Sequence, residues 1–431
     1  MTKVWIDHRD LSLEVGQSMA LEVTVDTHHG ASSAVVWSST DPAFVTVGHT
    51  GVVTARSAGA ASISAVSEHD PTMRDSVTVI VEGEIDVLWT RQFGTTRVTD
   101  VSVDGLGSAF AIVESVNDRG TVSTTLAVHT AAGDRKTFIH LPSFIFAGIA
   151  HDGSDNLLLV GTADDGIVIR QYEPGEGGDP IWTRTIPTRT GSAIAADPSG
   201  NVFVTGWRPG TSGGSRPGFV RKYSPAGALL WDRYSDFDPH DPGTHLATDA
   251  MGNVIVASGH GSTRLRTFDS NGNLVWSRIV SVDATPGGLA IDPSGGIYVS
   301  MTSDAASASQ LVVVRAYTET GSVRWSREAA SAGHNVVAGD LVAKNGMVYL
   351  VGTTDGTLGA SYAGGNDAFV RAYSDSGHEL WTHQFGTPQH DAALAVAVDA
   401  SGDVFVAGQT LGTLVPPGPS GGAGFLRKLA P

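Results

Sequence analysis

Hydrophobic and polar residues alternate along most of the chain, in short runs separated by turns that contain aspartate and glycine. Examples are "NVFVTG" at 201–206 and "DVFVAG" at 403–408. A period of two places every second side chain on one face, which is the pattern of a β-strand with one buried face. The chain is therefore predicted to be all-β and built from many short strands.

A tryptophan recurs along the chain at a nearly constant interval. In most copies a glycine stands four residues before it, as in "GALLW" from Gly227 and "GSVRW" from Gly321. The series is Trp89, Thr137 (threonine in the tryptophan position), Trp182, Trp231, Trp276, Trp325 and Trp381. The spacings of 45 to 56 residues are typical of the blades of a propeller. Seven positions predict seven blades.

Two further motifs alternate with the tryptophan. One is an apolar strand, an Asp-x-x-Gly turn and a second apolar strand, as in "AIAADPSGNVFVTG" at 193–206. The other is a strand such as "FVRKYSPAG" at 219–227, which directly precedes the tryptophan run. Each repeat then holds four strands, which we label A to D in chain order, with the tryptophan in strand D. Four antiparallel strands in each of seven repeats predict a seven-bladed β-propeller.

One nine-residue stretch occurs in two nearly identical copies, "VLWTRQFGT" at 87–95 and "ELWTHQFGT" at 379–387. The first copy is a D strand with no A, B or C strand before it, and the last repeat, within 393–429, supplies only A, B and C strands. We expect the strand at 85–93 to pair with 424–429 and complete the seventh blade. That pairing closes the ring and covers a sheet edge that would otherwise be free to associate.

The repeated residues themselves are predicted to be structural, because consensus residues of repeat proteins mostly serve the stacking of repeats. Aspartate and glycine suit tight turns, and the tryptophans are expected to pack between blades. The regularly recurring arginines are Arg170, Arg221, Arg315, Arg371 and Arg427. The second repeat departs most from the pattern, with His129 and Thr137 in aromatic positions.

Residues 1–83 carry none of these motifs and form their own series of alternating runs, which predicts one small β-sandwich. The stretches "WSSTDPAFVTV" (37–47), "GVVTA" (51–55) and "AGAASISA" (58–65) resemble the group 2 bacterial Ig-like domain. Residues 84–431 resemble the bacterial seven-bladed propeller repeat family, most closely at 364–410. We therefore expect two domains, an Ig-like domain at 1–83 and a propeller at 84–431. Both families occur in cell-surface, secreted and phage virion proteins, which implies a display or binding role.

A second resemblance points to a different class of protein. The stretch "AYTETGSVRW" at 316–325 resembles the tryptophan-docking repeat of quinone-dependent dehydrogenases. Those propellers typically have eight blades, and many use an adjacent cysteine pair near the cofactor. This chain has seven repeats and no cysteine, so we expect no cofactor.

Composition excludes several functions. The net charge of −17 argues against nucleic-acid binding, which normally needs a basic face, and against attachment to anionic lipid. The absence of cysteine rules out disulfides and thiolate metal ligands. No apolar run approaches the ~18 residues of a membrane span, and the opening segment lacks the apolar stretch of a signal peptide.

Candidate chemistry is confined to irregular loops. No HExxH helix, GxSxG elbow or phosphate-binding glycine loop occurs. In a propeller the D–A and B–C loops share one face, and here these loops vary while the A–B and C–D turns are uniform. Function tends to reside in such loops. The candidate binding residues are Trp207, Arg208, Tyr362, His240, His245, His334, His390 and Asp391.

Two alternatives remain open for these residues. The four histidines, in loops expected to point toward the central channel, could form a metal or acid–base cluster with Asp238, Asp241 and Asp391, or they are polar residues on a solvated rim. Trp207 and Tyr362 are either exposed anchors for a protein or glycan, or they fold their own loops.

We expect a non-enzymatic binding or display protein located outside the cell, at a cell surface or on a virion, such as a phage tail or capsid component. The Ig-like domain would attach to a protein partner and the propeller would present a ligand face, with neither nucleic-acid binding nor membrane insertion. The alternative is a propeller hydrolase, lyase or quinone-dependent dehydrogenase that uses the loop histidines.

Overall fold

The computed structural model of the chain is all-β, and every regular element that it describes is a strand. Among the described residues there is accordingly no helix long and apolar enough to cross a membrane. The structure describes residues 3–7, 10–26, 32–42, 44–56, 59–82, 85–94, 97–116, 122–140, 145–175, 178–187, 190–207, 217–234, 243–259, 261–303, 309–359, 362–416 and 422–430.

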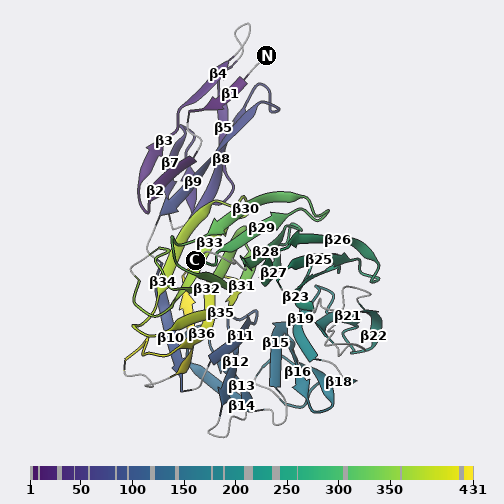
Figure 1. Cartoon of the computed structure of the whole chain (residues 1–431). Coiled ribbons are helices and arrows are strands. Elements are labelled where there is room, and N and C mark those ends of the chain that lie inside the picture. The colour runs from purple at the N-terminus through teal and green to yellow at the C-terminus, as the bar shows by residue number, and fades with distance from the viewer. Residues whose placement is uncertain are drawn as a thin grey trace.

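The N-terminal strands form a small sandwich that stands off from a ring of larger sheets (Figure 1). These strands are β1 (Lys3–Ile6), β2 (Asp10–Glu14), β3 (Ser18–Ala20), β4 (Val23–Asp26), β5 (Val35–Ser39), β6 (Val45–Val47), β7 (Val52–Ala55), β8 (Gly59–Ser67) and β9 (Arg74–Glu82). One sheet has the order β2-β9-β8-β5, with β2 parallel to β9, and β3-β7-β6 and β1-β4 complete the sandwich. Alternate residues such as Ile6, Val53, Ile63 and Val79 are fully buried between the sheets, as the period of two predicts.

Seven four-stranded antiparallel sheets form the ring, and we number them as blades 1 to 7. From the innermost to the outermost strand they are β11–β14 (Arg97–Val103, Ala109–Val116, Val122–His129, Arg135–His140), β15–β18 (Ile145–His151, Leu157–Ala163, Gly166–Tyr172, Trp182–Pro187), β19–β22 (Thr190–Ala196, Val202–Trp207, Gly218–Tyr223, Leu229–Tyr234), β23–β26 (Gly243–Thr248, Val254–Ser258, Thr263–Phe268, Leu274–Ser281), β27–β30 (Ala284–Ile291, Ile297–Ser303, Val312–Tyr317, Val323–Ala329), β31–β34 (Val336–Lys344, Met347–Thr354, Asp367–Ser374, Glu379–Phe385) and β35, β36, β37, β10 (Asp391–Val398, Val404–Thr410, Ala423–Leu429, Val87–Phe93). The seven-bladed propeller is confirmed.

The ring is closed by the first and last propeller strands, as the repeated nine residues predict. Strand β10 pairs antiparallel with β37, from Val87 opposite Leu429 to Phe93 opposite Gly424. A side-chain hydrogen bond supports the pairing, because Arg427 Nε donates to Thr90 Oγ1 at 3.0 Å. Blade 7 is therefore built from both ends of the propeller sequence, and β10 covers the edge of β37.

The hydrophobic core is divided among the interfaces between neighbouring blades. At the interface of blades 1 and 2, for example, Ile112 and Leu126 pack with Ile149 and Leu159. The Asp-x-x-Gly turns that join strands A and B are structural, as expected. In blade 3, Asp197 Oδ1 accepts the backbone N–H groups of residues 199 and 201 at 3.0 and 2.9 Å.

Five of the six tryptophans of strand D attach their blade to the next one by an indole hydrogen bond. In blade 2, Trp182 Nε1 donates to Pro225 O at 2.9 Å, and Arg184 Nε donates to Gly227 O at 2.6 Å, both in the C–D turn of blade 3. Gly227 has a φ of +74°, and a Cβ atom there would lie 2.8 Å from Trp182 Cδ2. The Gly-x-x-x-Trp pattern therefore records a contact between successive blades, because each glycine supports the tryptophan of the preceding blade.

The interface between blades 6 and 7 lacks this contact. Blade 7 has no continuous C–D turn, since β37 is followed by Ala430 and the D strand arrives from Asp86, whose carbonyl accepts the N–H of Ala430 at 2.9 Å. Trp381 Nε1 is accordingly buried without a hydrogen-bond partner. Ile80 and Ile85 pack against the cluster that contains Trp381, and β8 and β9 contact β34. The Ig-like sandwich thus lies beside the one position where the turn is missing.

Candidate binding sites

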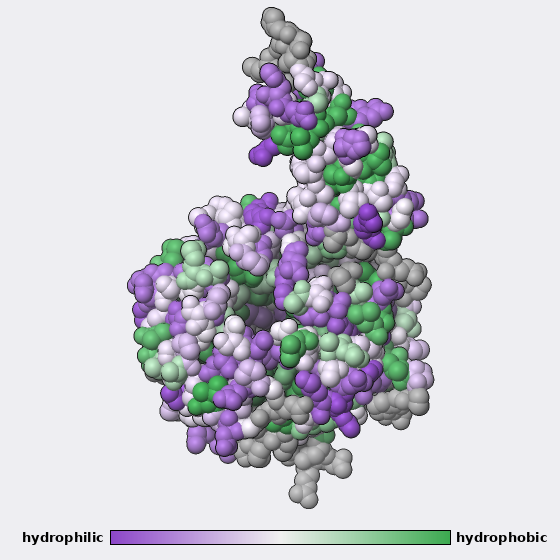
Figure 2. Space-filling view, turned by 180° about the vertical axis from the view of Figure 1, so that it is seen from behind, coloured by the Kyte–Doolittle hydropathy of each residue, from purple (hydrophilic) through white to green (hydrophobic). Residues whose placement is uncertain are grey.

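A narrow channel follows the axis of the propeller and is lined by the A strands of all seven blades. Its volume is about 510 Å³, and it opens in the hollow at the centre of the ring (Figure 2). Each A strand has a β-bulge at the same level, which leaves one residue unpaired and bends the strand. The residues that follow the bulges are Asp100, Gly148, Ala193, His245, Gly288, Asp340 and Ala395.

Two carboxylates in this ring join neighbouring A strands. Asp100 accepts the N–H groups of Val101 at 2.8 Å and of Ile149 in blade 2 at 3.0 Å. Asp340 in the same way accepts from Leu341 at 2.7 Å and from Val396 in blade 7 at 3.2 Å. Burial raises the pKa of both carboxyls to about 7, and the charge of Asp100 contributes to the shift at Asp340. Both groups are fixed by the backbone and have a structural role.

His245 is the predicted candidate that lies on the channel wall. It belongs to strand β23 rather than to a loop, at the position after the bulge. Its Nδ1 lies 3.0 Å from Thr244 Oγ1. Burial lowers the pKa of this histidine to about 4, so the ring is neutral at physiological pH.

The other predicted histidines in the described chain lie outside the channel wall. The exposed ring of His334 is 3.5 Å from Asp355, a carboxylate that also fixes Asn335. His390 is exposed, and its carbonyl accepts the N–H of Leu411 at 2.9 Å. The structure therefore does not gather His245, His334 and His390 into one group. Within the described ranges no three His, Cys, Asp or Glu side chains are placed to hold a metal ion.

Asp391 and the two predicted aromatic anchors differ in accessibility. Asp391 is buried and accepts the N–H and hydroxyl of Thr387 at 2.7 and 2.9 Å, so it fixes its own loop. Trp207 ends strand β20 and is partly buried. Tyr362 is 41% exposed, although its hydroxyl donates to Gly365 O. Predicted residues that lie outside the described residues are Arg208, Asp238, His240 and Asp241.

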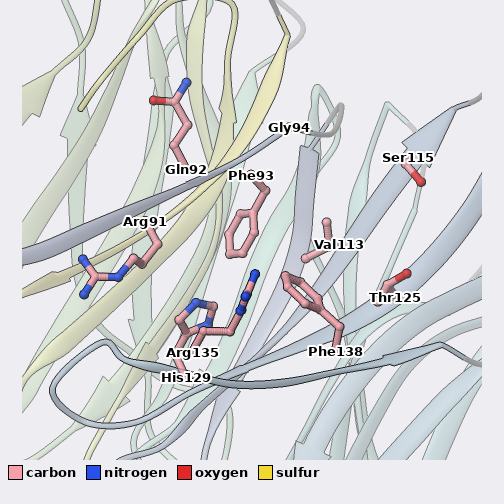
Figure 3. Close-up of a pocket in the computed structure, with 10 residues that line it drawn as sticks. All are labelled: Arg91, Gln92, Phe93, Gly94, Val113, Ser115, Thr125, His129, Arg135 and Phe138. Atoms are coloured by element: carbon pink, nitrogen blue, oxygen red, sulfur yellow. The ribbon is translucent and has the colours of Figure 1, made fainter. Parts of the chain in front are cut away.

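A larger cavity, which the sequence analysis did not single out, lies between β10 of blade 7 and blade 1. We call it the seam pocket; its volume is about 690 Å³. Its walls include Arg91, Phe93, Thr125, His129, Arg135 and Phe138. In Figure 3 the guanidinium of Arg135 points toward the ring of Phe93, between the rings of His129 and Phe138.

The only sequence signal of this pocket was the departure of blade 1 from the repeat. His129 replaces the aromatic residue of strand C, and its ring lies 6.3 Å from Trp89 and 5.6 Å from Phe93. Two residues earlier, Ala127 stands where the C strands of the other repeats have arginine, such as Arg221 in "FVRKY" at 219–223. Single departures of this kind do not reveal a cavity, because its walls come from four strands that belong to two different blades.

Comparison with known proteins agrees with both parts of the fold. Residues 1–79 match the family described as bacterial Ig-like domain (group 2). Residues 216–424 match the family described as outer membrane protein assembly factor BamB. The N-terminal sandwich and the propeller therefore both resemble established families.

Individual relatives are distant. Regulatory protein FlaEY of Caulobacter vibrioides is 25% identical over 179 residues, which cover 36% of this chain. The match spans only 18% of that relative's length. Among solved structures, the β-propeller domain of Cps50 (Swd1) from Myceliophteria thermophila has a TM-score of 0.53 and 8% identity, over 81% of this chain and 100% of that one. The Dos1 propeller has a TM-score of 0.49 and 11% identity, over 79% and 94%. The likeness to Cps50 shows the fold alone.

Proposed function

We propose that this chain, a bacterial Ig-like domain joined to a seven-bladed propeller, is a non-enzymatic binding protein exposed at a cell surface, outside the cell or on a virion. The Ig-like domain attaches the molecule to a protein partner. The propeller presents the face that carries its D–A and B–C loops, which we call the loop face, to a protein or glycan. The opposite face, formed by the A–B and C–D turns, is the turn face.

The observation that carries this proposal is the point at which the chain enters the ring. Val87 pairs with Leu429, at the turn-face end of β37, and Phe93 pairs with Gly424, at its loop-face end. The Ig-like domain therefore joins the propeller at the turn face. Strands β8 and β9 of the Ig-like domain contact β34 of blade 6. Ile80 and Ile85 pack there against the cluster that contains Trp381, which lies near the turn-face end of β34. An attachment through the Ig-like domain leaves the loop face free.

The accessible groups of the loop face suit recognition. Tyr362 and His334 are exposed there, and Tyr362 offers a rigid ring whose hydroxyl is already bonded. Aromatic residues contribute large contact area at low entropic cost and dominate many binding surfaces. The titratable groups of the channel are instead committed to the backbone, as Asp100 and Asp340 illustrate.

The proposal is tested with the full chain, fluorescently labelled, on an array of bacterial surface polysaccharides. Binding to at least one polysaccharide is expected, and the double change Trp207→Ala and Tyr362→Ala should reduce it at least about tenfold, since buried aromatic anchors contribute 2 kcal/mol or more. Trp5→Ala is the matched control, because Trp5 is a similarly exposed aromatic residue of the Ig-like domain. Binding that survives the double change would refute the loop face as the site, and hydrolysis of a bound polysaccharide would favour the enzyme alternative.

A further inference from the structure

We propose that the seam pocket binds a small organic anion, a planar apolar molecule that carries one carboxylate. This site lies between blades 7 and 1 and is independent of the attachment proposed for the loop face. It is formed by side chains of β10 and of strands β12, β13 and β14.

The pocket exists because blade 1 lacks an arginine that the other six blades have. In blades 2 to 7 an arginine stands two residues before the last large apolar or aromatic residue of strand C. These arginines are Arg170, Arg221, Arg266, Arg315, Arg371 and Arg427. In blade 1 this position is Ala127, which lies between Thr125 and His129 on the same face of β13. An alanine leaves the volume of a long side chain empty at the interface with blade 7.

Blade 7 shows what the missing side chain normally does. The guanidinium of Arg427 lies 3.9 Å from the centre of the Phe385 ring and reaches Thr90 Oγ1 at 3.0 Å. Phe93 holds in β10 the position that Phe385 holds in β34, four residues after the tryptophan. Ala127 belongs to the same buried cluster as Phe93 but is too short to reach across its ring as an arginine would, and Phe93 lines the cavity. At the interface of blades 6 and 7 the equivalent ring, that of Phe385, is covered by the side chain of Arg427.

The charge at the pocket selects an anion. The guanidinium of Arg135 faces the pocket (Figure 3), and none of the residues that line the pocket is Asp or Glu. Arg91 adds a positive charge at the edge, but its guanidinium is held by backbone carbonyls, since Nε donates to Gly133 O at 2.7 Å and Nη1 to Thr90 O at 3.1 Å. Arg135 has no carboxylate partner among the described residues and contacts the ring of Phe138, with 5.4 Å between its guanidinium carbon and the ring centre. Burial, and then the charges of Arg91 and Arg135, lower the pKa of His129 to about 4. A positive site on a chain of net charge −17 is most readily filled by a carboxylate, which the planar guanidinium binds through two hydrogen bonds.

The remaining walls fit a flat apolar body. Phe93 and Phe138 lie edge to face with their centres 6.4 Å apart. His129 is 2% exposed, and its Nδ1 is buried without a hydrogen-bond partner. The volume of about 690 Å³ lies in the range of small-molecule sites. A ligand that stacks on the two phenylalanines and bonds to His129 would satisfy that buried nitrogen.

The test uses 2-naphthoate as the probe and isothermal titration calorimetry on the full chain. Its neutral isostere 2-naphthamide and its cationic isostere 2-naphthamidine have the same flat body with a different head group. We expect naphthoate to bind one to one and the amide at least about tenfold more weakly, because a charge-assisted pair is about twice as strong as a neutral one. The amidine should bind more weakly than the amide.

Two variants locate the binding site. Ala127→Arg restores the repeat arginine and should abolish naphthoate binding without lowering the melting temperature. Arg135→Gln changes an exposed residue at the rim, which keeps the fold intact, and should weaken binding about tenfold or more. Arg97→Gln is the control, since Arg97 is a partly exposed arginine of blade 1 that pairs with Glu114 and does not line the pocket. No binding of naphthoate at millimolar concentration, equal binding of the amide, tighter binding of the amidine, or binding unaffected by Arg135→Gln would each overturn the proposal.

Discussion

The contact between successive blades predicts that two similar glycines respond very differently to alanine. Gly227 and Gly346 both lie in tight turns with a φ of +74°. A Cβ atom at Gly227 would lie 2.8 Å from Trp182 Cδ2, whereas a Cβ atom at Gly346 would meet nothing within 4 Å. Comparing Gly227→Ala with Gly346→Ala therefore separates the cost of the contact from the cost of the backbone angle.

The expected magnitudes follow from what Trp182 loses. A left-handed backbone costs an alanine about 1–2 kcal/mol, and this applies to both variants. At Gly227 the ring must also move, and it is 6% exposed, stacks on Tyr223 at 6.3 Å and donates to Pro225 O at 2.9 Å. Overpacking alone typically costs about 1–3 kcal/mol. We expect Gly227→Ala to lower the free energy of unfolding by about 2 kcal/mol more than Gly346→Ala does.

The assay is urea-induced unfolding followed by tryptophan fluorescence. Gly321→Ala provides an intermediate case, because its Cβ would lie 3.2 Å from Trp276 Cε2, and its loss of stability should fall between the other two. Equal destabilisation by Gly227→Ala and Gly346→Ala would refute the reasoning. It would mean that the glycines serve only the turns and that the tryptophans do not hold the blades together.

Three further predictions concern closure, domain independence and pH. Deletion of residues 1–94 removes β10 and should lower the melting temperature and cause aggregation, whereas deletion of 1–83 should cost far less; equal melting of the two truncations would contradict ring closure. Residues 1–83 expressed alone should give a β-sheet circular dichroism spectrum and melt cooperatively, and a random-coil spectrum would show that they need the propeller. Because folding raises the pKa of Asp100 and Asp340 to about 7, the folded state binds protons more tightly and these groups weaken it as pH rises from about 4 to 7. The double change Asp100→Asn and Asp340→Asn should therefore gain stability relative to the wild type between pH 5 and pH 8 in urea titrations, and a constant difference would contradict the assignment.

The fold was predictable from the sequence because each blade repeats the same contacts. The recurrence of Gly-x-x-x-Trp marks a physical contact between blades, and the repeated nine residues mark the closing strand. The pairing of 85–93 with 424–429 was expected, and the structure has β10 at Val87–Phe93 opposite β37. A contact that is made between many pairs of blades requires the same residue types at the same spacing in each repeat. Such a contact can therefore be recognised in a single sequence.

The candidate sites were less predictable. His245 was assigned to a loop, but the β-bulge places it inside strand β23 and on the channel wall. The seam pocket depends on Ala127, Phe93 and Arg135, which belong to three strands and two blades. A single sequence shows that a residue departs from a repeat, but it does not show which departures meet at one interface, since this depends on the distance between strands in space.

The pairing of β10 with β37 also fixes the order in which the protein can fold as it is made. Val87 leaves the ribosome 342 residues before its partner Leu429. At about 5 to 20 residues per second, β10 waits roughly 20 to 70 s for the strand that covers it. Blades 1 to 6 can assemble during this time, each on the edge of the one before, while the ring stays open at both ends. A pause in translation before Leu429 would prolong the state with a free edge, so the arrival of β37 decides whether the chain closes on itself or pairs with a neighbour.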